Sequence, residues 1–569
     1  MKTLRTSLVI SLFLLAAGSA RGQTIFVDAN AAGANNGSSW ENAYVYLQDA
    51  LTAAVSGDQI WVAQGMYKPD HGAGVTIGDR NAEFGLKAGV AMYGGFPIGG
   101  GVWEQRDPNI YESVLSGDLN GNDEPNFLNN SENSYRICHI GWSTGSTVLD
   151  GFTIDAANAN GPSPSPTSGA GLYNEGGGQM DVVNCKFLNN YAVSSGVAIR
   201  FRNPNDTGYN KFVGTLTGFE IINCLFQNNS GGRAIHMRGC SPIFRNCVFK
   251  QNSGAIYSSS FQAWPNNQVY SNPTFINVAF IGNSASSGGA MYIQGECTSL
   301  LVNCVFVANS SHYVDGGFDY GEGSAIFESG MSGEGKTTLL NCTITGNSAG
   351  WYTISNHIGT PTDLSNCIIW GNIAGTWGDL GSAERPFVLK SCCISDNDPN
   401  GTYIPPSSTI TAYNCIDLNP KFIRDPNDGS DGWGVGDNDD FGNLRLSPGS
   451  PCIDDANNAA VPPDSNDIDN DGNTTEPLPW GLDGRPRFAD GDCNSTDIVD
   501  MGAYEFTYAY FGDFDGQCDV DFVDFAILAS QWLEPPGSPS ADIAPEDLDG
   551  LVDELDLAVL IEHWLISFE

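Results

Sequence analysis

Basic residues are scarce in this chain. Only 24 of its 569 residues are Lys or Arg, against 66 Asp or Glu, so the formal net charge is −42. Because a phosphate backbone is recognised through a basic surface, this balance argues against nucleic acid as a partner. Charged residues make up only 16% of the chain and hydrophobic residues 41%, which indicates a folded protein with an acidic surface rather than a disordered polyelectrolyte.

Long hydrophobic runs are also missing, apart from one near the N-terminus. Lys2 and Arg5 precede an apolar stretch at residues 8–17, and small residues follow at 18–20. This order is typical of a secretory signal peptide, which we assign to residues 1–22. A membrane anchor is the alternative, but the stretch is shorter than the roughly 20 residues needed to cross a bilayer. We therefore expect no membrane span, and a protein that is secreted, extracellular or at the cell surface.

The 69 glycines follow no Gly-X-Y period, which excludes collagen. The chain does contain a repeat, but the segments between its copies show no helical period, which excludes helical leucine-rich repeats. What recurs is the phrase Asn-Cys-x-apolar-x-x-Asn, at intervals of 23 to 39 residues. Its first residues are Asn184, Asn223, Asn246, Asn277, Asn303, Asn341, Asn366, Ser391 and Asn414. The second asparagine, six residues on, is Asn190, Asn229, Asn252, Asn283, Asn309, Asn347, Asn372 or Asn397.

A short alternating strand, a turn and a nearly fixed return length predict a coil of strands. At about 3.3 Å per residue, 23 residues complete one narrow three-sided turn. Stacked turns place each strand parallel to its copy in the next turn, and backbone chirality makes the coil right-handed. Equivalent side chains then lie about 4.8 Å apart, and turn asparagines bond along the stack or adopt the left-handed conformation. The sequence therefore predicts an all-β protein, a right-handed parallel β-helix solenoid.

Eight of the 15 cysteines occupy one repeat position, flanked by alternating residues that mark an inward site. Stacked side chains about 4.8 Å apart match a disulfide poorly, since bridged Cβ atoms lie about 3.5–4.5 Å apart. We predict a buried column of free thiols. A secreted disulfide framework is the alternative. A metal site in this column is disfavoured because no Cys-x-x-Cys spacing accompanies it.

The ends of a solenoid need covering. Residues 43–51 are apolar at helical spacing and predict an N-terminal capping helix, followed by a first strand at residues 59–63. With the strand-like segments 90–96 and 149–154, the region from about 24 to 506 resembles the right-handed β-helix proteins of the pectin-lyase-like superfamily. The resemblance implies this fold, but that superfamily includes lyases, hydrolases, binding modules and adhesins.

A second strand follows each turn asparagine, and its outward positions carry rings and cations. The first outward residue is Tyr173, Arg200, His236, Tyr257, Tyr292 or Phe327, and two residues further come Glu175, Arg202, Arg238, Ser259, Gln294 and Ser329. An insertion after one of these strands carries Trp264. Aromatic rings stack on sugar rings and arginines pair with carboxylates, so this face predicts binding of an acidic polysaccharide. An exposed ladder that only keeps the sheet soluble is the alternative.

Lyases of the superfamily abstract a proton with Arg or Lys and neutralise the uronate with Ca²⁺. The resemblance therefore makes Arg200, Arg238 and His236 the candidate catalytic residues. It leaves Tyr173, Arg202, Tyr257, Tyr292 and Trp264 as candidate substrate-binding residues. The chain lacks an Arg-x-Pro-x-x-Arg element and the paired aspartates of the related galacturonases. The sequence therefore leaves open whether the protein is an enzyme. If it is one, we expect a polysaccharide lyase or a glycoside hydrolase.

Residues 467–472 read Asp-x-Asp-x-Asp-Gly. Carboxylates on alternate positions around a glycine turn suit a calcium ion, so Asp467, Asp469 and Asp471 are predicted ligands. The EF-hand pattern is incomplete because its twelfth position is Leu478, although Glu476 could reach the ion. A plain acidic turn is the alternative.

Residues 507–569 contain 15 acidic residues and neither Lys nor Arg. Residues 519–533 and 551–565 match at seven of 15 positions, and each copy is an acidic loop followed by an amphipathic helix. The pair resembles a type I dockerin, which implies two Ca²⁺ loops and docking onto a cohesin-like module. An amphipathic helical hairpin without calcium is the alternative.

The resemblance assigns calcium ligands in both loops. They are Asp513, Asp515, Asp521 and Asp524 in the first loop, and Asp547, Asp549, Asp553 and Asp556 in the second. Position one of the second loop falls on Pro545, with Asp542 as a substitute through a longer loop. In dockerins, the residues that recognise the cohesin are small hydroxyl residues. The equivalent positions of this chain carry Phe-Val at 522–523 and Glu-Leu at 554–555.

We expect five segments. They are the signal peptide 1–22, the N-terminal cap and first rungs 23–135, the central repeats 136–420, the C-terminal β-helix end with its calcium-type loop 421–506, and the dockerin-like domain 507–569. One functional hypothesis is a secreted modular protein of polysaccharide catabolism that binds an acidic polysaccharide and, if it is an enzyme, also cleaves it. The other is a non-catalytic surface or adhesive β-helix protein. Both place Ca²⁺ in the protein and a second extracellular protein at its tail.

Overall fold

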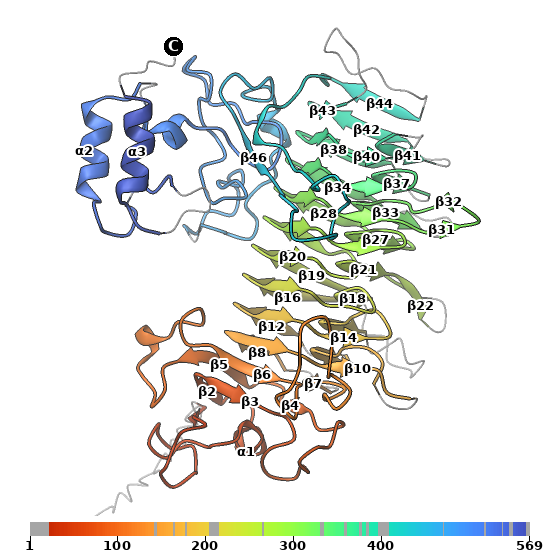
Figure 1. Ribbon diagram of the computed structural model, residues 1–569, viewed down its shortest axis with the longest axis vertical. Coiled ribbons are helices and arrows are strands. Elements are labelled where there is room, and N and C mark those ends of the chain that lie inside the picture. Colours follow the sequence, from red (N-terminus) through yellow and green to blue (C-terminus); the bar gives the residue numbers. More distant parts are fainter. Residues whose placement is uncertain are drawn as a thin grey trace, which may run out of the picture.

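The computed structural model describes residues 22–564, apart from residues 142–144, 163–165, 177–178, 204–214, 264–266, 330–334, 358–360, 375–377, 383–385, 396–408, 470, 517–518, 538 and 545–549. Residues 1–21 of the predicted signal peptide lie outside this part, as do Trp264, Asp547 and Asp549. Strands stack along the long axis of the molecule, and a pair of helices lies beside the last turns (Figure 1).

Three long parallel sheets form the body. Sheet A contains, in order, β1 (Thr24–Val27), β2 (Gln59–Ala63), β5 (Ala91–Phe96), β8 (Thr147–Asp150), β12 (Met180–Val183), β16 (Leu216–Ile222), β19 (Cys240–Arg245), β24 (Thr274–Ile276), β28 (Ser299–Val302), β34 (Thr337–Leu340), β38 (Thr362–Ser365), β42 (Phe387–Lys390) and β44 (Ile410–Tyr413). Sheet B contains β3 (Gly65–Tyr67), β6 (Ser113–Ser116), β9 (Phe152–Asp155), β13 (Lys186–Leu188), β17 (Leu225–Gln227), β20 (Val248–Lys250), β25 (Ala279–Ile281), β29 (Val305–Val307), β35 (Thr343–Thr345), β39 (Ile368–Trp370) and β43 (Cys393–Ile394). Sheet C contains β4 (Phe84–Leu86), β7 (Cys138–Ile140), β11 (Leu172–Asn174), β15 (Ile199–Arg202), β18 (Ile235–Arg238), β21 (Ile256–Ser259), β27 (Met291–Gln294), β33 (Ile326–Ser329), β37 (Ile354–Asn356) and β41 (Leu380–Ser382).

The chain visits sheets A, B and C in turn, and each strand pairs in parallel with its copy one turn later. The predicted parallel β-helix is therefore confirmed. Short strands at the turns form two further small sheets. One pairs β10 (Asn158–Ala159) with β14 (Tyr191–Ala192), and the other contains β26 (Ser284–Ala285), β30 (Ser310–Ser311), β36 (Ser348–Ala349) and β40 (Ile373–Ala374). Antiparallel hairpins are β22 (Phe261–Ala263) with β23 (Asn267–Val269), β31 (Val314–Asp315) with β32 (Phe318–Asp319), and β45 (Phe422–Arg424) with β46 (Asn443–Leu446).

The two asparagines of the repeat have different roles. The first makes the sharp corner from sheet A to sheet B with a left-handed backbone, at φ 50° for Asn184 and 53° for Asn223, a conformation that asparagine tolerates better than most residues. The second is buried at the corner after sheet B. There each amide donates to the next along the axis, as between Asn229 Nδ2 and Asn252 Oδ1, 2.9 Å apart, and between Asn252 Nδ2 and Asn283 Oδ1, also 2.9 Å apart. This buried ladder runs from Asn190 to Asn372.

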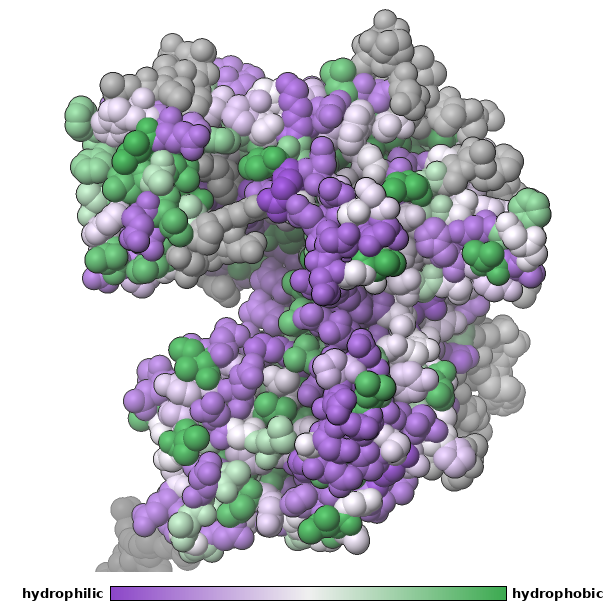
Figure 2. All heavy atoms as spheres, in the orientation of Figure 1, coloured by the Kyte–Doolittle hydropathy of each residue, from purple (hydrophilic) through white to green (hydrophobic). Residues whose placement is uncertain are grey.

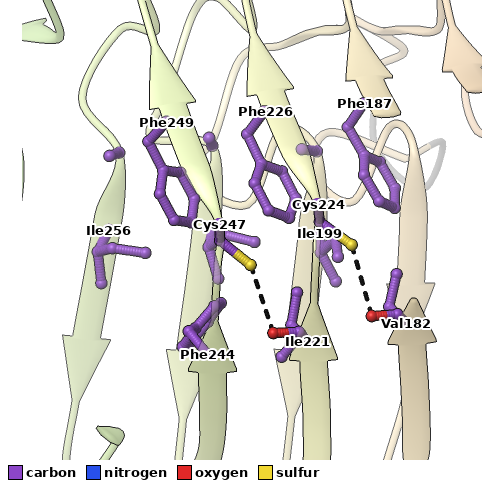
Figure 3. Packing of buried hydrophobic residues seen from close by; sticks show 14 of the residues in the cluster. Val182, Phe187, Ile199, Ile221, Cys224, Phe226, Phe244, Cys247, Phe249 and Ile256 are labelled. Atoms are coloured by element: carbon purple, nitrogen blue, oxygen red, sulfur yellow. Dashed lines mark hydrogen bonds between the residues drawn. The ribbon is translucent and has the colours of Figure 1, made fainter. Parts of the chain in front are cut away.

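The interior is built from matching columns. Phe187, Phe226, Phe249, Phe280 and Phe306 stack with ring centroids 4.6–5.2 Å apart. Beside them the repeat cysteines are buried free thiols, and Figure 3 shows Cys224 Sγ and Cys247 Sγ donating to the carbonyls of Val182 and Ile221 at 3.4 and 3.3 Å. The predicted thiol column is confirmed, and the alternative of a disulfide framework is wrong for this column. Cys493, outside the column, is disulfide-bonded.

These thiols are expected to resist alkylation in the folded protein. Burial raises the pKa of Cys224, Cys342, Cys367 and Cys392 well above the ordinary value of about 8.5, so little thiolate forms at pH 8. Because the folded pKa is the higher one, their contribution to stability is complete below pH 8.5 and falls as the pH rises above it. Iodoacetamide followed by mass spectrometry should label the column only after denaturant is added. Labelling of Cys247 in the native protein would contradict the packing.

The N-terminal end differs in one respect from the prediction. The helix α1 spans Leu47–Ala53, buries Leu47, Ala50 and Leu51, and packs on β1 and β4. Sheet A, however, begins with β1, ahead of the helix, and Ile25 of β1 lies beside Ile60 of β2. The first strand is therefore not at residues 59–63. The function of α1 as a cap stays a prediction.

The described residues between 421 and 506 add no rung to the three long sheets. Apart from β45, β46 and the 3-10 turn η3 (Asn458–Ala460), they form a strap that returns over the outer surface of the last turns. Its residues Val461, Leu478 and Val499 pack on Ile276 and Val302 of sheet A. Corner asparagines hold its backbone, as where Asn303 Nδ2 donates to Trp480 O at 2.8 Å and Asn341 Nδ2 to Asp500 O at 3.3 Å.

The tail contains the 3-10 turn η4 (Tyr508–Phe511) and the helices α2 (Phe522–Ser530) and α3 (Glu554–Glu562); a further turn, η1 (Trp103–Gln105), lies near the N-terminal end. The helices share a small core that includes Phe514, Val520, Leu528, Val552 and Leu560. The helical pair lies beside the upper rungs, and the molecule is hollowed between it and the N-terminal rungs (Figure 2). Among the described residues no helix is both long and apolar enough to cross a membrane.

Candidate ligand-binding face and calcium loops

The outward side of sheet C brings most of the predicted ligand-binding residues together. Tyr173, Arg200, His236, Tyr257, Tyr292 and Phe327 are register partners in consecutive strands. Arg202 and Arg238 are partners in the adjacent column. His139 of β7 extends the first column, beside Tyr173. At about 4.8 Å per strand, the column from β7 to β33 is roughly 29 Å long. We call this surface the sheet C face.

Ring contacts follow one another along the sheet C face. The His236 ring lies 4.3 Å from that of Tyr257, and Tyr257 lies 5.3 Å from Tyr292. Tyr292 then lies 5.2 Å from Phe327. The Tyr257 hydroxyl donates to Gln294 Oε1 at 2.5 Å, which fixes its ring. These rings present a nearly continuous apolar strip with polar edges.

Two arginines that the sequence analysis missed complete the face. The Arg233 guanidinium lies 4.8 Å from the Tyr292 ring centre, and that of Arg136 lies 4.2 Å from the ring centre of Tyr173. Arg233 lies two positions before Ile235, the first inward residue of β18. Arg136 lies two positions before Cys138, the first inward residue of β7. A search that extended the repeat alignment by two residues would have found them.

His236 is held neutral. Burial is the main cause, and the guanidinium groups of Arg200, Arg238 and Arg233 further lower its pKa, well below the ordinary value. Its Nδ1 faces Arg200 Nη1, so the neutral ring accepts a hydrogen bond there. The residue is only 7% exposed, which makes it a support for Arg200 rather than a group that reaches a ligand. The same three arginines lower the pKa of Tyr257, whereas its burial and Tyr292 raise it more strongly.

The two ends of the face are less cationic than its centre. Glu83 pairs with Arg136 at 3.2 Å and with His139 at 2.8 Å, and these partners lower its pKa although burial opposes them. At the other end, His357 Nε2 lies 2.8 Å from Glu322 Oε2. The positive potential is therefore concentrated at β15 and β18, around Arg200, Arg202 and Arg238.

The loop at residues 464–476 gathers more carboxylates than the sequence predicted. Asp467, Asp469 and Asp471 can each place one oxygen within 4.8 Å of the others, and Asp464, Asp469 and Glu476 form a second such group. Asp464 is fully buried, and neither its Oδ1 nor Glu476 Oε1 has a hydrogen-bond partner among the described residues. Burial, with the charges of Asp469 and Asp467, raises the pKa of Asp464. Buried acceptors without donors fit a calcium ion.

The first loop of the tail is built around Asp524. This buried carboxylate accepts from the backbone N–H of Phe514 at 2.6 Å, Asp515 at 3.2 Å and Asp521 at 2.8 Å. Asp513, Asp515 and Asp524 lie close enough to share one cation. Asp521, also a predicted ligand, caps α2 by accepting from Val523 N at 2.6 Å.

The second loop repeats these contacts with a different first residue. Asp556 accepts from Ile543 N at 2.6 Å, Ala544 N at 2.8 Å and Asp553 N at 2.8 Å, and Asp553 caps α3. Asp542 Oδ2 accepts from Gly550 N at 3.0 Å, as Asp513 Oδ1 does from Gly516 N at 2.8 Å. Asp542 is therefore the counterpart of Asp513 at the first ligand position, where the sequence pattern put Pro545. The loop from 542 to 556 is three residues longer than the loop from 513 to 524.

No family model and no curated protein matches the sequence. Among solved structures, the chain is similar to the pectate lyase Pel9A, with 12% identity, a TM-score of 0.42, and coverage of 86% of this chain and 97% of that one. A rhamnogalacturonan lyase matches with 13% identity and a TM-score of 0.34, over 71% of this chain and 91% of that one. A pectin methylesterase from carrot matches with 12% identity and a TM-score of 0.27, over 63% and 87%.

The helical pair also exposes a patch of apolar side chains. Phe522 is 73% and Ile561 60% exposed, and the Phe522 and Phe525 rings lie 5.1 and 6.3 Å from that of Trp564. These residues, with Leu557 and Leu560, line a cavity of about 450 Å³. We call this surface the helical-pair patch. Residues 522 and 555, which the sequence analysis placed at the cohesin-reading positions, are both exposed.

Proposed function

We propose that this protein is exported and binds an acidic, uronate-containing polysaccharide on the sheet C face. The observation that carries the proposal is the cluster of Arg200, Arg202, Arg233 and Arg238 beside the rings of Tyr257 and Tyr292. Only 24 residues of this chain are basic. Four arginines on one outward strip of a strongly acidic protein give an anionic polymer a favourable place to bind.

The chemistry of these side chains suits a uronate. A guanidinium donates two parallel hydrogen bonds to a carboxylate, and a flat ring stacks on the apolar face of a sugar. Arg202 on β15 and Arg238 on β18 are register partners about 4.8 Å apart, so an extended chain that runs along the solenoid axis can meet both at once. Export is supported by the signal-peptide pattern of residues 1–22.

Cleavage of the bound polymer is the finer part of the proposal. Arg200 or Arg238 would remove the proton at C5 of a uronate while the glycosidic bond at C4 breaks, which leaves a C4–C5 double bond on one product and a protonated hydroxyl on the departing sugar; Ca²⁺, if bound, would neutralise the uronate carboxylate. The second candidate function, non-catalytic binding or adhesion, is favoured by one observation. His236, the side chain best suited to proton transfer near neutral pH, is buried and bonded to Arg200.

Replacing Arg238 by glutamine is expected to weaken binding of oligogalacturonate about tenfold, because one charge-assisted pair with a carboxylate is lost. The double variant R200Q/R238Q should bind at least 30-fold more weakly. Isothermal titration calorimetry with oligogalacturonate measures both effects. Absorbance near 235 nm, where an unsaturated uronate product absorbs, reports elimination in the same samples.

The matched control is Arg245→Gln, on β19 of sheet A, where Arg245 Nη2 pairs with Glu220 at 2.6 Å. It removes the same charge from the same part of the solenoid but from another sheet, and its affinity should stay within about twofold of wild type. Equal losses in R238Q and R245Q would mean that only net charge matters, and the sheet C face would not be the site. Binding without absorbing product selects the non-catalytic function.

We further propose that the tail is a calcium-dependent, dockerin-like module that attaches the protein to a cohesin-like or other extracellular partner. Its support is the repeated contact pattern of Asp524 and Asp556, each accepting three backbone N–H groups in front of a capped helix. The helical-pair patch supplies an apolar surface for a partner. Ca²⁺ in the 464–476 loop would fix the strap.

A further inference from the structure

A long groove lies away from the sheet C face. It follows the corner after sheet B, has a volume of about 880 Å³, and extends from Asp155, the last residue of β9, to Ser310, which follows β29. The groove therefore spans six rungs, and the five steps of about 4.8 Å between them give a floor roughly 24 Å long. We call it the corner groove.

Two rows of polar side chains form the floor of the corner groove. In the outer row, Asn189 Nδ2 donates to Asp155 Oδ1 at 3.0 Å, Asn228 Nδ2 lies 3.5 Å from Asn189 Oδ1, and Gln251 follows. Asn189, Asn228 and Gln251 all have left-handed backbones, with φ of 49–56°, and exposed side chains. In the inner row, the hydroxyls of Ser230 and Ser253 lie 3.3 Å apart, and Ser284 and Ser310 continue it.

Aromatic rings stand at both ends of the floor. Phe127 lies at one end, held edge-on to Tyr191 with ring centres 6.1 Å apart. Trp433 lies at the other end, where its indole Nε1 donates to Gly346 O at 2.6 Å and its ring stacks on Phe441 at 6.0 Å. Both rings are therefore fixed before any ligand arrives.

The charge of the corner groove is opposite to that of the sheet C face. Asp123, Glu124 and Asp155 line it, and none of the lining residues that the structure describes is Lys or Arg. A uronate chain would be repelled here, whereas hydroxyl groups can donate to the carboxylates and accept from the amides. Rows of amides and hydroxyls between two flat rings are the groups that recognise sugars.

We propose that the corner groove is a second glycan site, which binds an uncharged polysaccharide chain along the solenoid axis. The protein would then hold two kinds of polymer at once, an acidic one on the sheet C face and a neutral one in the corner groove. The proposal does not depend on the function of the sheet C face, because the two sites share no residue among those named.

The test uses the full-length protein and hexasaccharides of neutral β-1,4-linked glucan, xylan and mannan, with oligogalacturonate as the charged probe. The variant N189G/N228G removes two floor amides, while glycine keeps the left-handed backbone without strain. The matched control is N184G/N223G at the sheet A corner, where the same amide-to-amide bond is 3.1 Å long and φ is 50–53°. Isothermal titration calorimetry measures each pair, and Trp433→Ala tests one end of the groove.

At least one neutral hexasaccharide should bind wild type. N189G/N228G should weaken that binding about tenfold, W433A should weaken it similarly, and N184G/N223G should leave it unchanged. Oligogalacturonate affinity should be the same in wild type and N189G/N228G, and should fall only in R238Q. Absence of neutral binding in wild type, or equal weakening in the two glycine variants, overturns the proposal. Loss of oligogalacturonate binding in N189G/N228G also overturns it, because the groove would then be the acidic site.

Discussion

Replacing Asn252 by alanine lowers the free energy of unfolding by about 3–5 kcal/mol, the largest single effect we expect in the solenoid. Asn252 is 2% exposed, and its Oδ1 accepts from the backbone N of Asn229 at 3.0 Å and from Asn229 Nδ2 at 2.9 Å. Its Nδ2 donates to Phe226 O and Asn283 Oδ1, both at 2.9 Å. Truncation removes these four buried hydrogen bonds from a site that water does not reach, and each lost bond costs about 1 kcal/mol.

Urea unfolding followed by circular dichroism measures this effect as a fall in the midpoint. The control is Asn246→Gly, which removes the corner amide six residues earlier. Asn246 Nδ2 donates to Asn223 Oδ1 at 3.2 Å in an exposed position, and its φ of 53° suits glycine. N246G should cost less than about 1 kcal/mol. Similar midpoints for N252A and N246G would show that the buried ladder does not stabilise the coil.

Removing calcium is expected to unfold the helical pair while the solenoid stays folded. Without a cation, Asp513, Asp515 and Asp524 hold like charges within 4.8 Å of one another, and their repulsion opposes the packing of the small helical core. The variant D524A should do the same in the presence of calcium, since three backbone N–H groups lose their acceptor, at a cost of about 3 kcal/mol or more.

Hydrogen exchange of the full-length protein, read on peptides from α2 and α3, checks this prediction. Calcium should slow exchange in both helices by at least tenfold, and D524A should abolish the difference. D521N is the control: asparagine caps a helix as well as aspartate does, and Asp521 lies outside the group formed by Asp513, Asp515 and Asp524. Exchange that is the same with calcium and with a chelator would refute the calcium proposal for the tail.

The repeat phrase predicted the solenoid because one short pattern specifies both a corner and a core column. A left-handed asparagine followed by an inward cysteine fixes the register of each turn, so Cys185, Cys224 and Cys247 align whatever the length of the intervening insertions. The sheet C face followed from the alternation of side chains along a strand. Arg136 and Arg233 lay outside the aligned strands and were missed for that reason.

The strap and the first strand could not be predicted in the same way. β1 is a four-residue strand whose partner β2 lies 35 residues away, and no local signal identifies it. The strap has no repeat, and its position depends on contacts such as that of Asn303 with Trp480, 177 residues apart. In the second tail loop the sequence predicted Asp542 only as a substitute through a longer loop, because a fixed-length pattern puts the first ligand position on Pro545.

The attachment of the strap determines how the molecule responds to tension. If the helical pair is tethered, a pull on it does not reach the last turn at β44 first. It enters the solenoid at the corner asparagines of β28, β34 and β38, where Asn303, Asn341 and Asn366 hold the backbone of the strap. Bonds loaded side by side must break together, whereas a coil pulled from its end would unwind one rung at a time. The protein is thus built to bear force sideways on the rungs beneath the strap and to resist peeling from its end.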